Sequence, residues 1–75
     1  MAAETFKVAR HKRSNYVTIE KQEDYSGFSY TIYDGELNEI EEGTYEDASA
    51  SVIDVLRWVA EFFGLTGKVY RVSRS

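Results

Sequence analysis

The sequence contains no cysteine and no proline, and its single histidine is His11. Without cysteine the chain has neither a disulfide framework nor a thiolate metal site, and one histidine excludes a multi-histidine metal site within one chain. The absence of proline argues against a polyproline ligand or a rigid linker. We therefore expect a chain without metal or cofactor, whose stability comes from packing.

Long hydrophobic runs are also missing. No apolar segment approaches the roughly 18 residues that a membrane span requires, and the first residues lack the continuous apolar segment of a signal peptide. The chain has 75 residues, the size of one domain whose core only just outweighs chain entropy. We therefore expect a single cytoplasmic domain over residues 1–75, with a homodimer as one way to gain stability.

Positive charge is scarce in the middle of the chain. Every charged side chain between residues 22 and 56 is acidic, whereas most cations lie toward the two ends. The formal net charge of −4 therefore hides a dipolar arrangement, and such a field bears on partners more than on fold. The acidic residues are Glu23, Asp24, Asp34, Glu36, Glu39, Glu41, Glu42, Glu46, Asp47 and Asp54, and the terminal cations are Lys7, Arg10, Lys12, Arg13, Lys68, Arg71 and Arg74.

Alternation of apolar and polar residues predicts strands in the first half of the chain. The clearest are residues 28–33 and residues 16–20. Residues 5–9 also alternate, with Phe6 and Val8 on one face. Because cations follow directly, the first 15 residues fit a flexible basic arm equally well.

The dipeptide Asp34-Gly35 predicts a tight hairpin directly after the strand of residues 28–33, since Asp-Gly favours the positive φ values of a two-residue turn. The chain then returns along residues 36–42. Leu37 and Ile40 differ in parity, so either one points outward or a bulge shifts the register. A strand this acidic suits a sheet edge, where charge discourages pairing with another chain.

Helical periodicity follows, over about residues 45–63. Thr44 with Asp47 predicts the N-terminal cap, and Gly64 with Leu65 the C-terminal one. Residues 68–72 form a final strand. The expected fold is α+β: a single antiparallel-rich sheet of three to five strands, ordered β-β-β-α-β with an optional extra N-terminal strand, and one long helix on one face. The apolar stripe of the helix comprises Ala48, Val52, Val55, Leu56, Val59 and Phe63.

Catalytic motifs are weak, and we expect no enzyme. General acid–base chemistry requires carboxylates held in a cleft with separated pKa values, and a domain of this size has little room for a cleft. Residues 64–68 resemble part of a phosphate-binding loop, but they follow a helix and lack the hydroxyl residue after the lysine. His11 lies among cations, with no neighbouring carboxylate in sequence to orient it.

The acidic segment admits three interpretations: a solvated surface, a docking face for a basic protein partner, or a mimic of DNA phosphates. We take docking on a basic partner as the leading hypothesis, with an inhibitory or antitoxin-like regulatory role. The helix has a narrow polar face, so Trp58 and Phe62 are left to add an apolar contact or a homodimer interface. The predicted partner-binding residues are Asp34, Glu36, Glu39, Glu41, Glu42, Trp58 and Phe62.

The alternative is a single-stranded nucleic-acid-binding module. Tyrosines interleave with the terminal cations, and bases stack on sheet aromatics beside arginine and lysine in known modes of recognition. The net negative charge opposes contact with a phosphate backbone. The residues predicted for this alternative are Arg10, Lys12, Arg13, Tyr16, Tyr70 and Arg71.

Two segments resemble a known family. Residues 19–24, Ile-Glu-Lys-Gln-Glu-Asp, and residues 42–48, Glu-Gly-Thr-Tyr-Glu-Asp-Ala, are similar to the first turn and the helix-opening segment of the N-terminal domain of HicB-type antitoxins. The resemblance implies a partial ribonuclease-H-like fold, no catalysis, and binding of a small basic toxin. We carry over no individual residue as functional.

Overall fold

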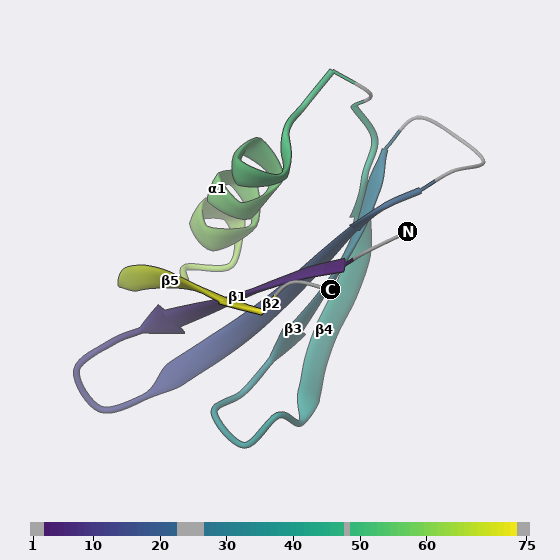
Figure 1. Ribbon diagram of the computed structural model, residues 1–75. Helices are drawn as coiled ribbons and strands as arrows, with labels where there is room; N and C mark the ends of the chain where they lie inside the picture. The colour runs from purple at the N-terminus through teal and green to yellow at the C-terminus, as the bar shows by residue number, and fades with distance from the viewer. Residues whose placement is uncertain (1–2, 23–26, 48, 74–75) are drawn as a thin grey trace.

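The computed structural model describes residues 3–22, 27–47 and 49–73. Four strands come first: β1 (Ala3–Ala9), β2 (Ser14–Lys21), β3 (Phe28–Tyr33) and β4 (Glu39–Tyr45). The helix α1 (Val52–Phe62) and the strand β5 (Lys68–Ser73) follow (Figure 1). Several residues named above lie outside the described ones: Glu23, Asp24, Ala48 and Arg74.

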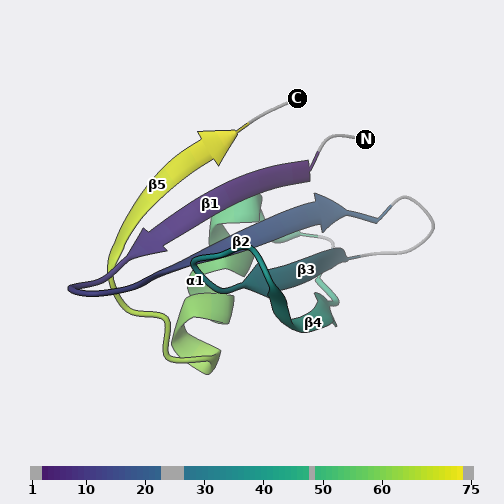
Figure 2. The ribbon, with the colours of Figure 1, turned by 90° about the horizontal axis from the view of Figure 1, so that it is seen from below.

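The strands form a five-stranded sheet in the order β4-β3-β2-β1-β5, and every neighbouring pair is antiparallel. The predicted α+β class, with one antiparallel sheet and one helix, is therefore confirmed. The four-element order without an extra strand is not the observed one: the optional N-terminal strand is present as β1, so four strands precede the helix. Seen from below, α1 lies behind the sheet (Figure 2). We call the side of α1 the near face and the opposite side the far face.

The core lies between α1 and the near face. Alternate residues of β1, β2 and β3 are buried, as their alternating pattern predicts. Phe6 and Val8 are among them, so β1 is a full member of the sheet, and of the two predicted alternatives the structure shows the strand for residues 3–9. The buried hydrophobic residues are Phe6, Val8, Val17, Ile19, Phe28, Tyr30, Ile32, Val55, Leu56, Val59 and Leu65.

The helix is shorter than the sequence predicts and begins later. Thr44 belongs to β4, and the N-cap is Ser51, which forms a capping box with Asp54 in place of the predicted pair. Tyr45 extends β4 because it pairs with Phe28 and packs against Trp58.

At the other end of the helix the predicted cap is confirmed. Gly64 has a left-handed φ of 70°, and the N–H of Leu65 donates to the carbonyl of Ala60 at 2.7 Å. This is the hydrogen bond of a Schellman motif, which ends a helix by satisfying one of its last carbonyls. Leu65 is buried against the core, as an apolar residue after such a cap should be.

The connection between β3 and β4 is longer than the predicted tight turn. The carboxylate of Asp34 accepts hydrogen bonds from the backbone N–H groups of Glu36 and Asn38, and Leu37 takes the left-handed conformation with φ 68°. β4 therefore begins at Glu39 instead of residue 36. A register shift between Ile32 and Tyr33 places the extra residue Ile40 in β4, so the bulge alternative is the correct one.

Candidate functional site: an acidic edge strand and an aromatic shelf

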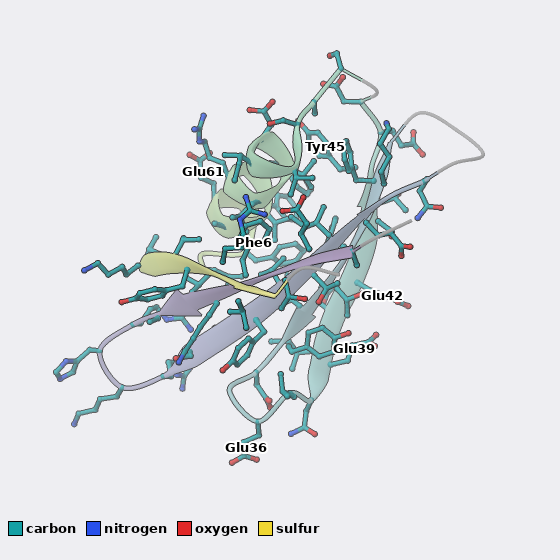
Figure 3. The ribbon with its side chains drawn as sticks, viewed as in Figure 1. Phe6, Glu36, Glu39, Glu42, Tyr45 and Glu61 are labelled. Carbon is teal, nitrogen blue, oxygen red and sulfur yellow. The ribbon has the colours of Figure 1, made fainter. Side chains whose placement is uncertain are left out.

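Three of the five predicted acidic docking residues lie on β4, an outermost strand of the sheet, and the other two, Asp34 and Glu36, lie in the loop before it. Glu39, Glu41 and Glu42 are all exposed. Figure 3 shows Glu42 and Glu39 along β4, with Glu36 in the loop beyond them and Tyr45 at the opposite end. The three strand carboxylates therefore line one edge of the sheet, and we call this set the acidic edge.

The register divides the acidic edge between the two faces. Glu41 pairs with buried Ile32, so its side chain belongs to the near face. Glu42 pairs with Thr31 and Glu39 with Tyr33, which place both on the far face. The edge presents negative charge on both sides of the sheet because Glu41 and Glu42 alternate, and the bulge at Ile40 places Glu39 on the same face as Glu42.

Asp34 has a structural duty within this region. Its carboxylate accepts from the backbone of Asn38 and Glu36 and from the Asn38 side chain. The pKa of Asp34 lies below its usual range, and the main cause is the hydrogen bond from the Asn38 backbone. Partial desolvation acts in the opposite direction, and the hydrogen bonds from the Glu36 backbone and the Asn38 side chain lower the pKa further. Asp34 shapes the loop that carries Glu36 toward the edge.

Aromatic side chains form a shelf beside the near side of β4. Trp58 stacks on Phe62 with ring centroids 5.0 Å apart and lies 5.1 Å from the ring of Tyr45. Phe62 is 66% exposed, so the structure brings the two predicted helix residues together and leaves one of them open to a partner. We call Tyr45, Trp58 and Phe62 the aromatic shelf.

The sequence analysis missed Tyr45 because it assigned this residue to the helix. Burial, with a contribution from the charge of Glu41, raises the pKa of the neighbouring Tyr30 hydroxyl. The signal for Tyr45 is not local: its pairing with Phe28 places it in β4, on the same face as Glu41 and Gly43.

A pocket of about 300 Å³ opens next to the shelf. Tyr45 and Trp58 line it together with Asp47, Asp54 and Glu61. Asp54 belongs to the capping box, and hydrogen bonds to Ser51, the backbone one first, lower its pKa below the usual range. The pocket therefore combines aromatic rings with carboxylates, and Arg57 is the cation in its lining.

The residues predicted for nucleic acid are distributed differently. One cross-strand row on the far face joins Tyr70, Lys7, Tyr16, Tyr33 and Glu39, one residue from each strand. The Lys7 ammonium lies 6.0 Å from the centre of the Tyr16 ring. Tyr16 and Tyr70 thus share a surface, to which the structure adds Lys7 and Tyr33.

The predicted arginines lie away from that row. Arg71 belongs to the near face, where it forms an ion pair with Glu4 and covers the ring of Phe6. Arg10 is partly buried and donates to Asn15. The far-face row therefore has Lys7 as its own cation.

Lys12 and Arg13 lie in the β1–β2 hairpin beside the acidic loop. They share the lining of a hollow of about 600 Å³ with Asp34 and Glu36. Residues predicted for two different partners therefore meet at one end of the sheet. Their charges are of opposite sign, whereas β4 carries three glutamates and no cationic side chain.

Comparisons with protein-family models, with curated proteins and with solved structures found no match. Within residues 3–22, 27–47 and 49–73, no three side chains of the metal-ligating types gather into a group able to hold a metal ion. Among the same residues, the structure contains no helix with the length and apolar character needed to cross a membrane.

Proposed function

We propose that this chain is a non-enzymatic binding protein whose acidic edge accepts an extended, basic segment of a protein partner. The observation that carries the proposal is the position of Glu39, Glu41 and Glu42, all exposed on an outermost strand. An outermost strand offers backbone N–H and C=O groups along its outer side, and a partner strand can complete them.

Charge on both faces of β4 supports an extended partner. Successive side chains of a strand point to opposite faces, so a paired segment sends alternate residues toward Glu41 on one side and Glu42 on the other. Cations at successive positions of the partner each meet a carboxylate. Ion pairs of this exposed kind contribute little affinity each but raise the association rate and select against acidic segments.

The aromatic shelf supplies the apolar part of the contact. Phe62 and Trp58 stack in parallel, and Tyr45 links them to the end of β4. A partner side chain on the near face can cover the exposed ring of Phe62, and an arginine or lysine can lie over an aromatic face at about 0.5–1 kcal/mol for an exposed site. The partner is therefore recognised by charge along the strand and by an aromatic contact at its end.

The same charges restrict unwanted pairing. Two copies of β4 placed edge to edge would bring glutamates together, which opposes association through this strand. The specificity of β4 is the difference between its affinity for a basic strand and its affinity for a second acidic strand. The glutamates raise the first affinity and lower the second.

The wider role remains part of the proposal. A protein that occupies the basic surface of its partner would act as a regulator or inhibitor, in the manner of an antitoxin. The similarity to HicB-type antitoxins and the cytoplasmic location stay predictions of the sequence. Three residues of the segment that resembles the helix opening of those antitoxins end β4 in this structure instead of opening the helix: Gly43, Thr44 and Tyr45.

Capture of partners from a native lysate at low and high salt tests the proposal. We expect a basic protein to be retained by the wild-type chain at low salt and released as salt rises, and Glu42→Gln or Glu41→Gln should release it at a lower salt concentration than the wild type does. Glu20→Gln is the matched control, because Glu20 is exposed on β2, away from the edge. Equal retention by the Glu42 and Glu20 variants, or no salt-sensitive basic partner, would contradict the proposal.

A second candidate function is single-strand nucleic-acid binding on the far face, favoured by the row of Tyr70, Lys7, Tyr16 and Tyr33. Base stacking on aromatic rings contributes about 1–3 kcal/mol per base. Titration with labelled single-stranded RNA and DNA at low ionic strength decides this candidate. Binding that Tyr16→Ala weakens and Thr18→Ala leaves unchanged would support it, whereas no binding at low salt would exclude a phosphate-driven contact.

A further inference from the structure

The opposite edge of the sheet has another character. β5 is the outermost strand beside β1, and its exposed residues include valines: Val69 is 46% exposed and Val72 47%. Five of the six residues of β5 pair with β1, and β5 has a neighbouring strand on that side only, as for any outermost strand. An exposed apolar edge strand is a template for pairing with another chain.

An apolar groove runs between β5 and the helix. Its volume is about 460 Å³, and its lining includes Ile53, Leu56 and Ala60 from α1 with Leu65 and Val69. Ile53 is 44% exposed at the rim. Groove and strand edge are continuous through Val69, so one partner can cover both.

We infer that a second copy of this chain covers them, through antiparallel pairing of the two β5 strands about a twofold axis at Tyr70. Tyr70 is opposite Lys7 on the far face, while Val69 and Arg71, opposite buried Val8 and Phe6, belong to the near face. A twofold axis perpendicular to the sheet keeps the faces together. Both helices then lie on one side of a continuous sheet, and the two grooves open toward each other.

The charges of β5 fit this register. With Tyr70 opposite Tyr70 of the second copy, Arg71 is opposite Val69, and Lys68 faces Val72, the residue that the register shift between Thr5 and Phe6 leaves without a partner in β1. No cation is then directly opposite another, which would be destabilising. The Arg71 guanidinium is also paired with Glu4 of its own chain, so the interface meets a compensated charge. The aromatic and apolar residues meet at the centre of the strand pair.

Twofold pairing also closes the assembly. An isologous interface uses the same patch on both copies and is satisfied in a dimer. The two outer strands of that dimer are both β4, whose glutamates discourage further addition of the same chain. Pairing of β5 with β4 of the next copy would instead repeat without closing. A chain of 75 residues also has a small core, and association of small domains is a common source of stability.

Sedimentation equilibrium over a range of concentrations tests the dimer. We expect a monomer–dimer equilibrium that Ile53→Lys weakens by about tenfold or more, because it places a charge in the covered groove. Phe62→Lys alters another exposed apolar residue of the same helix, outside the groove, and should leave the equilibrium unchanged. A monomer at all concentrations, an open-ended series of oligomers, or a loss caused by Phe62→Lys alone would each overturn the inference.

A single introduced cysteine tests the register. Because the chain contains no cysteine, Tyr70→Cys can form one disulfide, between two copies, and directly opposite residues of an antiparallel pair approach the required separation. We expect this variant to cross-link in dilute oxidising solution several times faster than Thr44→Cys, an exposed residue of β4. Equal rates, or faster cross-linking through Thr44→Cys, would contradict pairing through β5.

Discussion

The two edges of this sheet differ in charge, in polarity and in their neighbours. β4 carries Glu39, Glu41 and Glu42 with an aromatic shelf beside it, whereas β5 carries exposed valines beside an apolar groove. Both strands have the same outward backbone groups, so side chains alone determine which partner each edge admits. The difference teaches that the acidic middle of the sequence gathers at one edge of the sheet, and we propose that this edge takes a basic segment and the other edge a second copy.

The largest expected effect tests whether the β1–β5 side is anchored in the core. Phe6→Ala should lower the free energy of unfolding by about 3–5 kcal/mol, because Phe6 is almost fully buried between α1 and the sheet (Figure 3). Urea unfolding at one fixed protein concentration measures it. Ile40→Ala on the exposed β4 bulge should change it by about 0.5 kcal/mol or less. If both variants lower the free energy of unfolding by a similar small amount, β1 is not anchored in the core and the basic-arm interpretation would apply.

The next effect concerns the attachment of β4. The Tyr30 ring lies over Gly43, and a Cβ at that position would come within 2.5 Å of the Tyr30 hydroxyl oxygen. Gly43→Val should therefore cost about 1–3 kcal/mol by overpacking, and it should also impair capture of a basic partner. Thr44→Val changes the next residue of the same strand, which is exposed. If both variants unfold at the same urea concentration, the close contact does not hold β4 in place.

A smaller effect, of opposite sign, comes from the loop before β4. Leu37 is 63% exposed and holds a left-handed φ of 68°, a conformation that costs a residue with a Cβ about 1–2 kcal/mol. Leu37→Gly should raise the free energy of unfolding by about 0.5–1 kcal/mol after its greater chain entropy is subtracted. Thermal unfolding measures the change. Leu37→Ala should give no such gain, and an equal gain would point to lost surface hydrophobicity instead of relieved strain.

The smallest effect is a pH dependence at the acidic end of the sheet. The pKa of Asp34 is lower in the folded chain than in the unfolded one, where it is about 4. Its contribution to stability is therefore complete above the unfolded pKa and is lost as pH falls through the folded one. Asp34→Asn should flatten the fall in melting temperature between about pH 5 and pH 3. Asp54 has a lowered pKa too, so part of the fall should remain.

Much of the fold followed from local patterns. Alternation along residues 28–33 and 16–20 predicted β3 and β2, and Gly64 with Leu65 predicted the end of α1. The predicted start of α1 was wrong because the sequence offers two similar N-cap pairs: Thr44 and Ser51 each precede an aspartate by three residues. Pairing of Tyr45 with Phe28, a contact distant in sequence, decides between them.

The candidate site was predictable in composition and not in arrangement. The charge of the sequence was enough to predict which strand is acidic. The faces of Glu39 and Glu41 were not predictable, because the bulge at Ile40 places them on opposite faces and depends on the register with β3. The groove beside β5 needs the approach of Ile53 to Val69, residues from two elements. Local periodicity carries no information about that distance.

Amide hydrogen exchange, followed residue by residue by NMR at increasing protein concentration, tests the central claim that the two edges admit different partners. The outward N–H groups of β5 should gain protection as concentration rises, while those of β4 continue to exchange rapidly. Protection that grows equally on both edges, or on β4 alone, would contradict the assignment of self-association to β5 and of a basic partner to β4.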